Sequence, residues 1–290
     1  MTLDMVLDTD IGDDIDDALA LGLICNSPEL NLIGVTTVFR DAPRRAILAT
    51  EILRLFGREN VPVHAGTSQP LLQRWSDIPH GGAQLGKQFQ ALDPKLEPPV
   101  GALAVDFLAQ QIIEYSKCGV KLTIAAIGPL TNIALLFALH PATIPLCRLM
   151  IMGGQPSERL AEWNILCDPE AAAMVFRAGA DLTMIGLNVT TRCVLSEAQV
   201  AQFRDAKTER ATFLADLVDL WNHEVILHDP LTILTLLDDC VQLEPKRIEV
   251  GLCGEERALT TEVEGEANCR VAVAVDAERA IDDFMRRILK

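Results

Sequence analysis

The feature that most constrains this chain is the alternation of short apolar runs with longer segments of helical periodicity. Such pairs follow one another at 3–7 and 17–25, at 30–38 and 43–56, and at 122–127 and 129–139. Strands that alternate with helices are typical of a mainly parallel sheet with helices on its faces. We therefore expect residues 1–290 to form a single α/β domain, with a mainly parallel central sheet flanked by helices.

The second half of the chain continues this pattern. Strands are predicted at 148–152, 182–185 and 270–275, and residues 196–199 have the Ser-x-x-Gln spacing that opens a helix. Residues 66–99 are rich in Pro, Gly, Gln and Ser and predict a long loop, a feature that often contributes to binding. Ligands of open α/β sheets bind beyond the carboxyl ends of the strands, so polar clusters that follow predicted strands are the candidates for a site.

The overall charge excludes several classes of partner. The chain has 25 Lys and Arg against 41 Asp and Glu, a formal net charge of −16. Such a chain repels a phosphate backbone and an anionic lipid surface, so we expect neither a nucleic-acid polymer nor a membrane as partner. No apolar run approaches the roughly 18–20 residues that a membrane span needs.

Cysteine spacing and the N-terminal residues predict the compartment. The two closest of the eight cysteines are Cys240 and Cys253, so no CxxC motif for zinc or redox chemistry is present. The N-terminus lacks the basic segment and apolar stretch of a secretory signal. We therefore expect a cytoplasmic protein whose cysteines are reduced.

An acidic cluster follows the first predicted strand directly. Its members are Asp8, Asp10, Asp13, Asp14, Asp16 and Asp17. Carboxylates this close repel one another, and a hard divalent cation with oxygen ligands would relieve the repulsion. Gly12 permits a sharp turn that would fold the later acids back toward Asp10. Acids at a helix N-terminus also cap its amides, but that accounts for one or two of them. The cluster therefore predicts a metal site.

A second candidate is the sequence His228-Asp229-Pro230, which opens a helix predicted at 230–237. Asp229 as the cap and Pro230 in the first turn explain two of these residues by local structure alone. The histidine is left free by that explanation. A histidine beside an acid at a helix start suits a proton donor next to a metal-binding carboxylate.

Two further polar segments are less specific. Glu162 and Asn164 are spaced to share one face of an extended segment, where they could bind hydroxyls; a pair of solvated loop residues is the alternative. At the Gly-Pro-Leu-Thr-Asn turn that begins at Gly128, a free carbonyl such as that of Ile127 could face a cation. Neither GxxxxGK[ST] nor GxGxxG occurs, so no phosphate-binding loop is expected.

Together and in this order, these segments resemble the inosine-uridine-preferring nucleoside hydrolase family over nearly the whole chain. The motifs that carry the resemblance are DTDIGDDIDDALAL (8–21), VHAGTSQPL (63–71), IGPLTNIAL (127–135), MGG (152–154), AEWNILCDPEAA (161–172) and HDPLT (228–232). The resemblance implies a Rossmann-like fold of the nucleoside hydrolase type. It also implies Ca²⁺-dependent hydrolysis of the N-glycosidic bond of ribonucleosides to free base and ribose, in nucleoside catabolism and salvage, by a homodimer or homotetramer.

The resemblance further implies a role for individual residues at the cation. The Ca²⁺ ligands would be Asp10, Asp17, Asp229 and the carbonyl of Ile127. Because the first motif is longer here than is usual in the family, Asp14 is an alternative ligand. Asp10 would also act as the general base on a water that the cation binds.

On the substrate side, the resemblance implies contacts from one set of residues. They are Asp16, Asp41, Glu162, Asn164 and His80. Asp41 stands where many members of the family have an asparagine. His80 lies in the long loop expected near the base, where a surface-loop histidine is the alternative. His228 would lie near the departing base, which we expect between the loops around 66–90 and the helices near 215–228.

Two other functions stay open at this point. Asp8-Thr9-Asp10 after a strand superficially resembles the aspartate pair of Mg²⁺-dependent phosphohydrolases of the haloacid-dehalogenase type. The altered sugar-side positions, Asp41 and residues 155–160, are also compatible with a non-catalytic nucleoside or ribose binder on the same scaffold. No motif determines whether purine or pyrimidine nucleosides are preferred.

Overall fold

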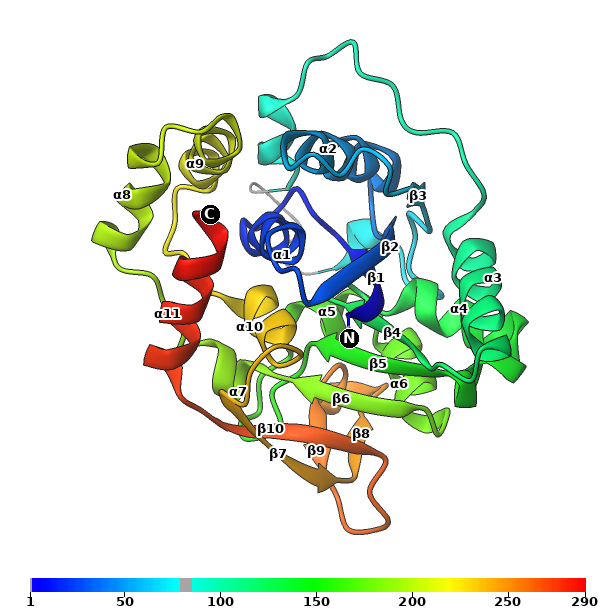
Figure 1. Ribbon diagram of the computed structural model, residues 1–290. Helices are drawn as coiled ribbons and strands as arrows, with labels where there is room; N and C mark the ends of the chain where they lie inside the picture. The colour runs from blue at the N-terminus through cyan, green and yellow to red at the C-terminus, as the bar shows by residue number, and fades with distance from the viewer. Residues whose placement is uncertain (1, 79–84) are drawn as a thin grey trace.

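The architecture is an eight-stranded central sheet covered by helices, in a computed structural model that describes residues 2–78 and 85–290 (Figure 1). The strand order is β3-β2-β1-β4-β5-β6-β10-β7. These strands are β1 (Leu3–Thr9), β2 (Leu30–Thr37), β3 (Val63–Ala65), β4 (Leu122–Ala126), β5 (Cys147–Met152), β6 (Asp181–Ile185), β7 (Val241–Lys246) and β10 (Cys269–Val275). All neighbours are parallel except β7, which pairs antiparallel with β10. The predicted α/β class with a mainly parallel sheet is confirmed.

Helices connect the strands and cover the sheet. They are α1 (Asp16–Cys25), α2 (Ala42–Leu55), α3 (Ala104–Lys117), α4 (Thr131–Leu139), α5 (Trp163–Cys167), α6 (Pro169–Arg177), α7 (Leu187–Thr190), α8 (Glu197–Asp205), α9 (Glu209–Trp221), α10 (His228–Leu234) and α11 (Ala277–Ile288). Short 3-10 turns are η1 (Trp75–Asp77), η2 (Lys87–Ala91), η3 (Pro141–Leu146) and η4 (Gly254–Glu256). A separate two-stranded sheet pairs β8 (Ile248–Val250) with β9 (Thr260–Glu262).

Two apolar cores lie on the two faces of the central sheet, because successive side chains of a strand point to opposite sides. In β1, Met5 and Leu7 belong to one core and Val6 belongs to the other, all without exposed surface. The first core packs against α1, α2, α9, α10 and α11, and the second against α3, α4 and α6 (Figure 1). Burial on both faces explains the near-continuous apolar runs of the sequence.

Differences from the predicted elements lie at the margins of the fold. The helix predicted at 129–139 begins at Thr131, after the turn that follows β4. The edge strand β7 was not predicted, since Pro245 interrupts its sequence. Proline is tolerated there because β7 is the last strand of the sheet and needs main-chain partners on one side only. The Ser196 capping box is confirmed at the start of α8.

The carboxyl ends of three central strands meet at one edge of the sheet. β1 ends at Thr9, β4 at Ala126 and β5 at Met152, and these strands are neighbours in the sheet. Asp10 and Ile127 directly follow two of these ends, so residues distant in sequence arrive at the same place. This edge is where open α/β sheets bind ligands.

The sequence predicts reduced cysteines and no membrane-spanning segment, and the structure bears on both expectations. All eight cysteines are free thiols, and six of them are buried. Within residues 2–78 and 85–290, no helix combines the length and apolar character that crossing a membrane requires.

Candidate active site

A cavity of about 430 Å³ is lined by residues from this edge of the sheet. Its carboxylates are Asp10, Asp13, Asp14, Asp16, Asp17, Glu162 and Asp229. Its apolar and aromatic residues are Leu85, Ile127, Met152, Ala161, Trp163, Leu187 and Trp221, and Asn164 and His228 complete the lining. The volume is within the range of roughly 300–1,000 Å³ that is usual for small-molecule sites.

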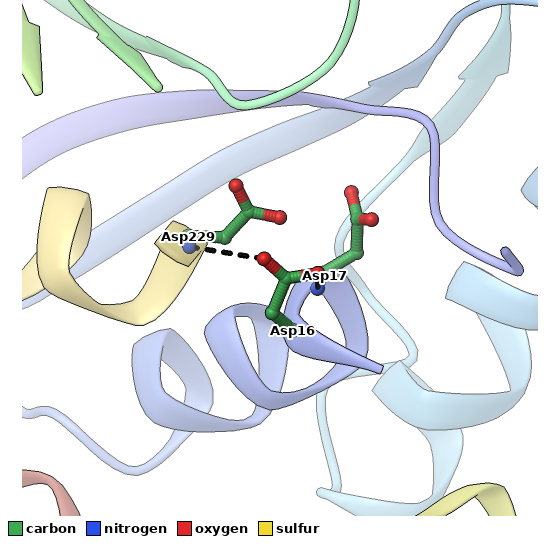
Figure 2. Close-up of side chains that lie close together, drawn as sticks. All are labelled: Asp16, Asp17 and Asp229. Atoms are coloured by element: carbon green, nitrogen blue, oxygen red, sulfur yellow. Dashed lines mark hydrogen bonds between the residues drawn. The ribbon is translucent and has the colours of Figure 1, made fainter. Parts of the chain in front are cut away.

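Three of these carboxylates lie especially close together. Asp16 and Asp17 are in the first turn of α1 and Asp229 is in the first turn of α10, so two helix N-termini converge here (Figure 2). Each contributes a carboxylate oxygen, and these oxygens lie within 4.8 Å of one another. The N–H of Asp229 donates to Oδ2 of Asp16 at 3.3 Å, which ties the two helices together. Thr9, at the end of β1, donates its hydroxyl to Asp17.

Burial makes negative charge costly at this place. The pKa values of Asp16 and Asp229 are raised well above the usual range, first by burial and then by neighbouring carboxylates. Burial also raises the pKa of Asp17 to about 7, against the opposing effect of the Thr9 hydroxyl. The pKa of Asp10 is raised for the same first reason. Without a positive group nearby, these acids would favour their protonated forms.

One arginine approaches the cluster but is bound to other groups. Arg45 of α2 is 1% exposed, and its Nη2 forms an ion pair with Oδ2 of Asp13 at 2.8 Å. Its remaining donors bind the carbonyls of Asp10, Ile11 and Phe39. The guanidinium therefore braces the loop between β1 and α1.

The carboxylate oxygens of Asp16, Asp17 and Asp229 fit a hard divalent cation. Within the part of the chain that the structure describes, no lysine or arginine forms an ion pair with Asp16, Asp17 or Asp229. Three buried carboxylates thus face one another without a cation from the protein. Carboxylate and carbonyl oxygens are ligands of Ca²⁺ and Mg²⁺, whereas softer metals prefer sulfur and nitrogen. A divalent cation would offset the charge that burial makes unfavourable.

The structure brings the predicted metal ligands to this one cavity. Those that line it are Asp10, Asp17, Ile127 and Asp229. Asp16, expected at the ribose, also lines the cavity and belongs to the group of closest carboxylates. The alternative ligand Asp14 also lines the cavity, but its Oδ1 accepts a hydrogen bond from the N–H of Ile15 at 2.5 Å.

Glu162 and Asn164 line the cavity from the start of α5, not from an extended segment as expected. A helix begins at Trp163 because the Glu162 carboxylate caps it. That carboxylate accepts hydrogen bonds from the N–H groups of Asn164 at 2.8 Å and Ile165 at 3.1 Å. The spacing argument was therefore wrong about the backbone, although both side chains reach the cavity.

Asn164 also holds the carbonyl that was expected to face a cation. Its Nδ2 donates to the oxygen of Ile127 at 2.8 Å and to the oxygen of Met152 at 3.2 Å. This amide therefore joins the ends of β4 and β5. A carbonyl oxygen has two lone pairs, so the hydrogen bond from Asn164 leaves one lone pair of Ile127 for a cation.

The start of α10 differs from the prediction. The helix begins at His228 and its N-cap is Leu227, which makes no side-chain cap bond. Asp229 is therefore not the cap. It lies inside the first turn, where its carboxylate is free to join Asp16 and Asp17 (Figure 2).

His228 lines the same cavity and contacts α7. Its Nδ1 lies 2.7 Å from the hydroxyl oxygen of Thr190. Burial lowers the pKa of His228 to about 4, so the neutral imidazole is favoured in the protein alone.

Two predicted substrate contacts are not among the lining residues. Asp41 is exposed, and its Oδ1 accepts a hydrogen bond from the N–H of Arg44 at 3.2 Å as the N-cap of α2. The structure thus gives Asp41 a helix-capping role, and its expected sugar contact stays a prediction. His80 lies outside the described residues.

Asp8, the first member of the phosphohydrolase-like pair, is also away from the cavity. It has no exposed surface, and its Oδ1 accepts hydrogen bonds from the Thr36 hydroxyl at 2.6 Å and the Asn132 amide at 2.7 Å. A nucleophile must reach its substrate, so this placement argues against the phosphohydrolase alternative.

The loop that carries the aspartates is held by the segment around η2. The N–H of Gly86 donates to Oδ1 of Asp13 at 2.7 Å. Gly12 has a φ of +123°, and a Cβ at this position would lie 2.4 Å from the ring of Phe89. Glycine is therefore required at position 12 both by its backbone conformation and by close packing.

The aromatic part of the cavity was not predicted residue by residue. Trp163 and Trp221 are two of the three tryptophans in the chain, and both line the cavity. Trp221 ends α9, within the region 215–228 where base contacts were expected, and its Nε1 donates to the carbonyl of Glu224 at 3.1 Å. The one sequence feature that could have pointed to these two lining residues is that the chain has only three tryptophans.

The whole chain is similar to known nucleoside hydrolases. Residues 5–282 match the family model described as inosine-uridine preferring nucleoside hydrolase. The chain is 36% identical over 256 residues to the pyrimidine-specific ribonucleoside hydrolase RihA of Enterobacter sp. (strain 638), covering 82% of this chain and 80% of that protein. The plant nucleoside hydrolase PpNRh1 has a TM-score of 0.88 at 26% identity, covering 100% and 99%. The purine-preferring ribonucleoside hydrolase from Gardnerella vaginalis has a TM-score of 0.83 at 29% identity, covering 99% and 98%.

Proposed function

Since the chain belongs to the inosine-uridine preferring nucleoside hydrolase family and is a ribonucleoside hydrolase, we propose that it cleaves pyrimidine ribonucleosides with the help of Ca²⁺. The observation that carries this proposal is a single cavity that combines unpaired buried carboxylates with an aromatic lining. The carboxylates suit a cation and ribose hydroxyls. The aromatic residues suit a flat base.

The proposed cation site uses oxygen donors from three parts of the chain. They are the side chains of Asp10, Asp16, Asp17 and Asp229 and the carbonyl of Ile127. Ca²⁺ accepts about six to eight oxygen ligands in a flexible arrangement, whereas Mg²⁺ demands a strict octahedron, so the crowded set favours Ca²⁺. When bound, the ion supplies a Lewis acid and a grip on sugar hydroxyls.

Asp10 is the proposed general base. The oxygen of the attacking water forms a bond to C1′ of the ribose while the N-glycosidic bond breaks and its electron pair leaves with the base. The proton lost by the water goes to the Asp10 carboxylate. The sugar gains positive character during this step, and the other carboxylates that line the cavity stabilise it.

His228, Trp163 and Trp221 are proposed to surround the base, because they are the histidine and the aromatic residues of the cavity lining. The preference for pyrimidines is supported by the pyrimidine-specific relative at 36% identity. The purine-preferring relative at 29% identity makes inosine the informative competitor.

The remaining expectations belong to the same proposal. We expect a homodimer or homotetramer in the cytoplasm, with residues 1–290 folding as one domain. Light scattering decides the oligomeric state, by comparing the mass in solution with the 31.7 kDa of one chain.

The proposal is tested by incubating the protein with uridine, cytidine, inosine and adenosine and measuring the free base. We expect uracil and cytosine to appear faster than hypoxanthine and adenine. EGTA should stop the reaction, and Ca²⁺ should restore it better than Mg²⁺. Binding without release of base would instead indicate a nucleoside binder, and faster release of hypoxanthine would contradict the pyrimidine preference.

A further inference from the structure

Two adjacent threonines at the end of α7 use their hydroxyls differently. Thr190 is buried, and its Oγ1 lies 2.7 Å from Nδ1 of His228. Thr191 is exposed, and its hydroxyl donates to the carbonyl of Leu187 at 2.7 Å within the same turn of chain. The first hydroxyl therefore reaches a cavity residue, whereas the second satisfies its own helix.

The contact between Thr190 Oγ1 and His228 Nδ1 fits either ring tautomer, and the burial of the hydroxyl assigns its direction. A buried hydroxyl proton needs an acceptor. Among the described residues, the hydrogen bond that the Thr190 Oγ1 makes is the one with Nδ1 of His228. The hydroxyl therefore donates, and Nδ1 accepts with its lone pair. A neutral imidazole that accepts through Nδ1 carries its proton on Nε2.

We propose that Thr190 is a positioning residue that holds His228 in the tautomer whose Nε2–H is offered to the leaving base. This inference rests on the proposed function, because it names how one residue of that site is oriented. Thr190 occupies Nδ1, and the ring lines the cavity, so Nε2 is the nitrogen left for a ligand.

The offered Nε2–H meets the charge that the base acquires. When the N-glycosidic bond breaks, its electron pair moves onto the base, and Nε2–H donates a hydrogen bond to the nitrogen or carbonyl oxygen that carries the charge. His228 loses no proton. Asp10 takes a proton from the water and passes it to solvent, and the released base takes a proton from solvent. In the other tautomer a lone pair on Nε2 would face this negative charge.

This orientation also selects a class of substrate. The base needs a hydrogen-bond acceptor beside the glycosidic nitrogen, as the 2-carbonyl of a pyrimidine or N3 of a purine provides, so the class is that of nucleosides. A p-nitrophenyl riboside is the contrasting substrate, because its phenolate is stable without a donor. A role of Thr190 in leaving-group stabilisation therefore affects uridine and spares the nitrophenyl compound, whereas a merely structural role affects both.

The test uses three variants of the full chain. Thr190→Val removes the hydroxyl at nearly constant volume, Thr190→Ser keeps it, and Thr191→Val is the matched control next to it. For each variant, kcat and KM are measured with uridine and with p-nitrophenyl riboside. We expect Thr190→Val to lower kcat for uridine about 10- to 100-fold, the effect of one lost hydrogen bond to a charged group, with KM nearly unchanged. Thr190→Ser and Thr191→Val should behave as the wild type.

Several outcomes would overturn the inference. Unchanged uridine turnover in Thr190→Val is one, and an equal loss on both substrates without recovery in Thr190→Ser is another. If Thr190→Val does not fold, ¹⁵N spectra of the wild-type histidine rings decide, since a proton on Nδ1 of His228 contradicts the tautomer. A wild type that releases base from no nucleoside refutes the proposed function instead, so the two failures are distinguishable.

Discussion

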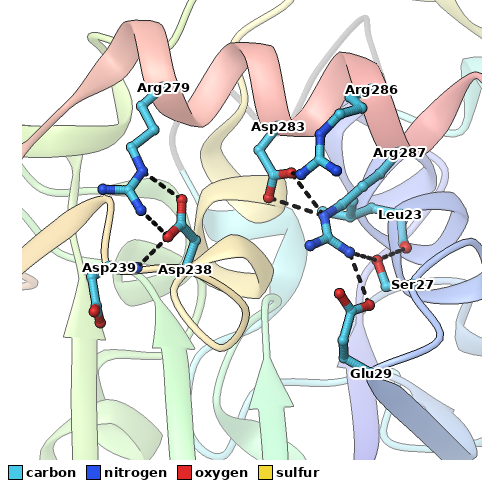
Figure 3. Close-up of polar contacts among 9 residues, drawn as sticks. All are labelled: Leu23, Ser27, Glu29, Asp238, Asp239, Arg279, Asp283, Arg286 and Arg287. Atoms are coloured by element: carbon cyan, nitrogen blue, oxygen red, sulfur yellow. Dashed lines mark hydrogen bonds and ion pairs between the residues drawn. The ribbon is translucent and has the colours of Figure 1, made fainter.

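The two ends of α1 carry acidic side chains in opposite electrostatic settings. At the N-terminal end, Asp16 and Asp17 face Asp229, and burial raises the pKa of all three. Just beyond the C-terminal end, Glu29 meets Arg287 of α11, and the hydrogen bond from Arg287 lowers the pKa of Glu29 (Figure 3). One end therefore pairs its acids with an arginine, and the other gathers buried acids that could hold a metal ion.

The paired end is built as a structural joint. Arg287 donates to Oε2 of Glu29 at 2.9 Å and through Nε to Oδ2 of Asp283 at 2.9 Å (Figure 3). The amide of Asn26 donates to the carbonyls of Arg287 at 3.0 Å and Ile288 at 3.1 Å. These contacts fix α11 on the end of α1. The contrast shows that the same type of side chain is paired with arginine at the joint between α1 and α11, whereas Asp16, Asp17 and Asp229 have no arginine or lysine partner among the described residues.

The largest expected effect comes from neutralising a carboxylate of the unpaired site. Asp10→Asn keeps the shape of the side chain but removes the proposed base, so kcat should fall by about 10²- to 10⁴-fold while circular dichroism stays unchanged. The matched control is Asp41→Asn, since Asp41 is exposed and asparagine is also a good helix cap. Full activity of Asp10→Asn would refute the assignment of the base.

The next effect comes from breaking the paired end. The side chains of Arg287 and Asp283 are 7% and 8% exposed, so Arg287→Met removes one of the two arginines that bind this buried carboxylate and leaves Arg286 as the other. Unfolding in urea should show a loss of up to about 3 kcal/mol, the cost of lost hydrogen bonds to a charged group, with kcat per folded molecule unchanged. A variant of normal stability but reduced turnover would mean that this joint serves the site as well.

Ca²⁺ should raise the free energy of unfolding through the carboxylates at the N-terminal end of α1 and not through the arginine contacts near its C-terminal end. At a Ca²⁺ concentration of about 100 times Kd, binding to the folded protein adds about 2.7 kcal/mol, which thermal unfolding with and without EGTA measures. Asp229→Asn should lose this shift. Asp283→Asn should retain it despite its lower stability, and equal shifts in both variants would place the cation elsewhere.

The smallest effect on the free energy of unfolding is expected from the ion pair between Asp238 and Arg279 of α11. Asp238 accepts hydrogen bonds from Arg279, which lower its pKa (Figure 3). The contribution is therefore present above the ordinary aspartate pKa of about 3.9 and is lost as the pH falls through the lower folded value. At pH 7, Asp238→Asn should cost at most about 1 kcal/mol in urea unfolding, and it should converge with the wild type in acid. A difference that grows in acid would contradict this sign.

The parts of the fold that were predictable are those in which local pattern and burial agree. β1 and β4 are buried on both faces and therefore appear in the sequence as short apolar runs. β7 was not predicted because its sequence has no continuous apolar run, and Pro245 interrupts its alternation of apolar and polar residues. The start of α10 was misplaced because Asp229 resembles a cap, while the helix begins one residue before it.

The part of the candidate site formed by acids close together in sequence was predictable. The part formed by residues distant in sequence was not. The crowding of aspartates before α1 pointed to a cation site, and the His-Asp pair pointed to a second contributor. The grouping of Asp16 with Asp229 depends on how α1 packs against α10. The pairing of Arg45 with Asp13 depends on α2 in the same way, and nothing in the local sequence of either residue announces it.

The order of residues along this chain sufficed for the alternating elements, the mainly parallel sheet and an acidic cluster that could hold a metal, because these follow from periodicity and from charges that are neighbours in sequence. The different environments of the individual aspartates came from the packing of the folded chain. Asp8 became structural, Asp13 became paired, and Asp16 joined the unpaired group. The physical reason is that burial and the distance to a countercharge set the cost of a carboxylate, and both arise only when remote helices and strands come together.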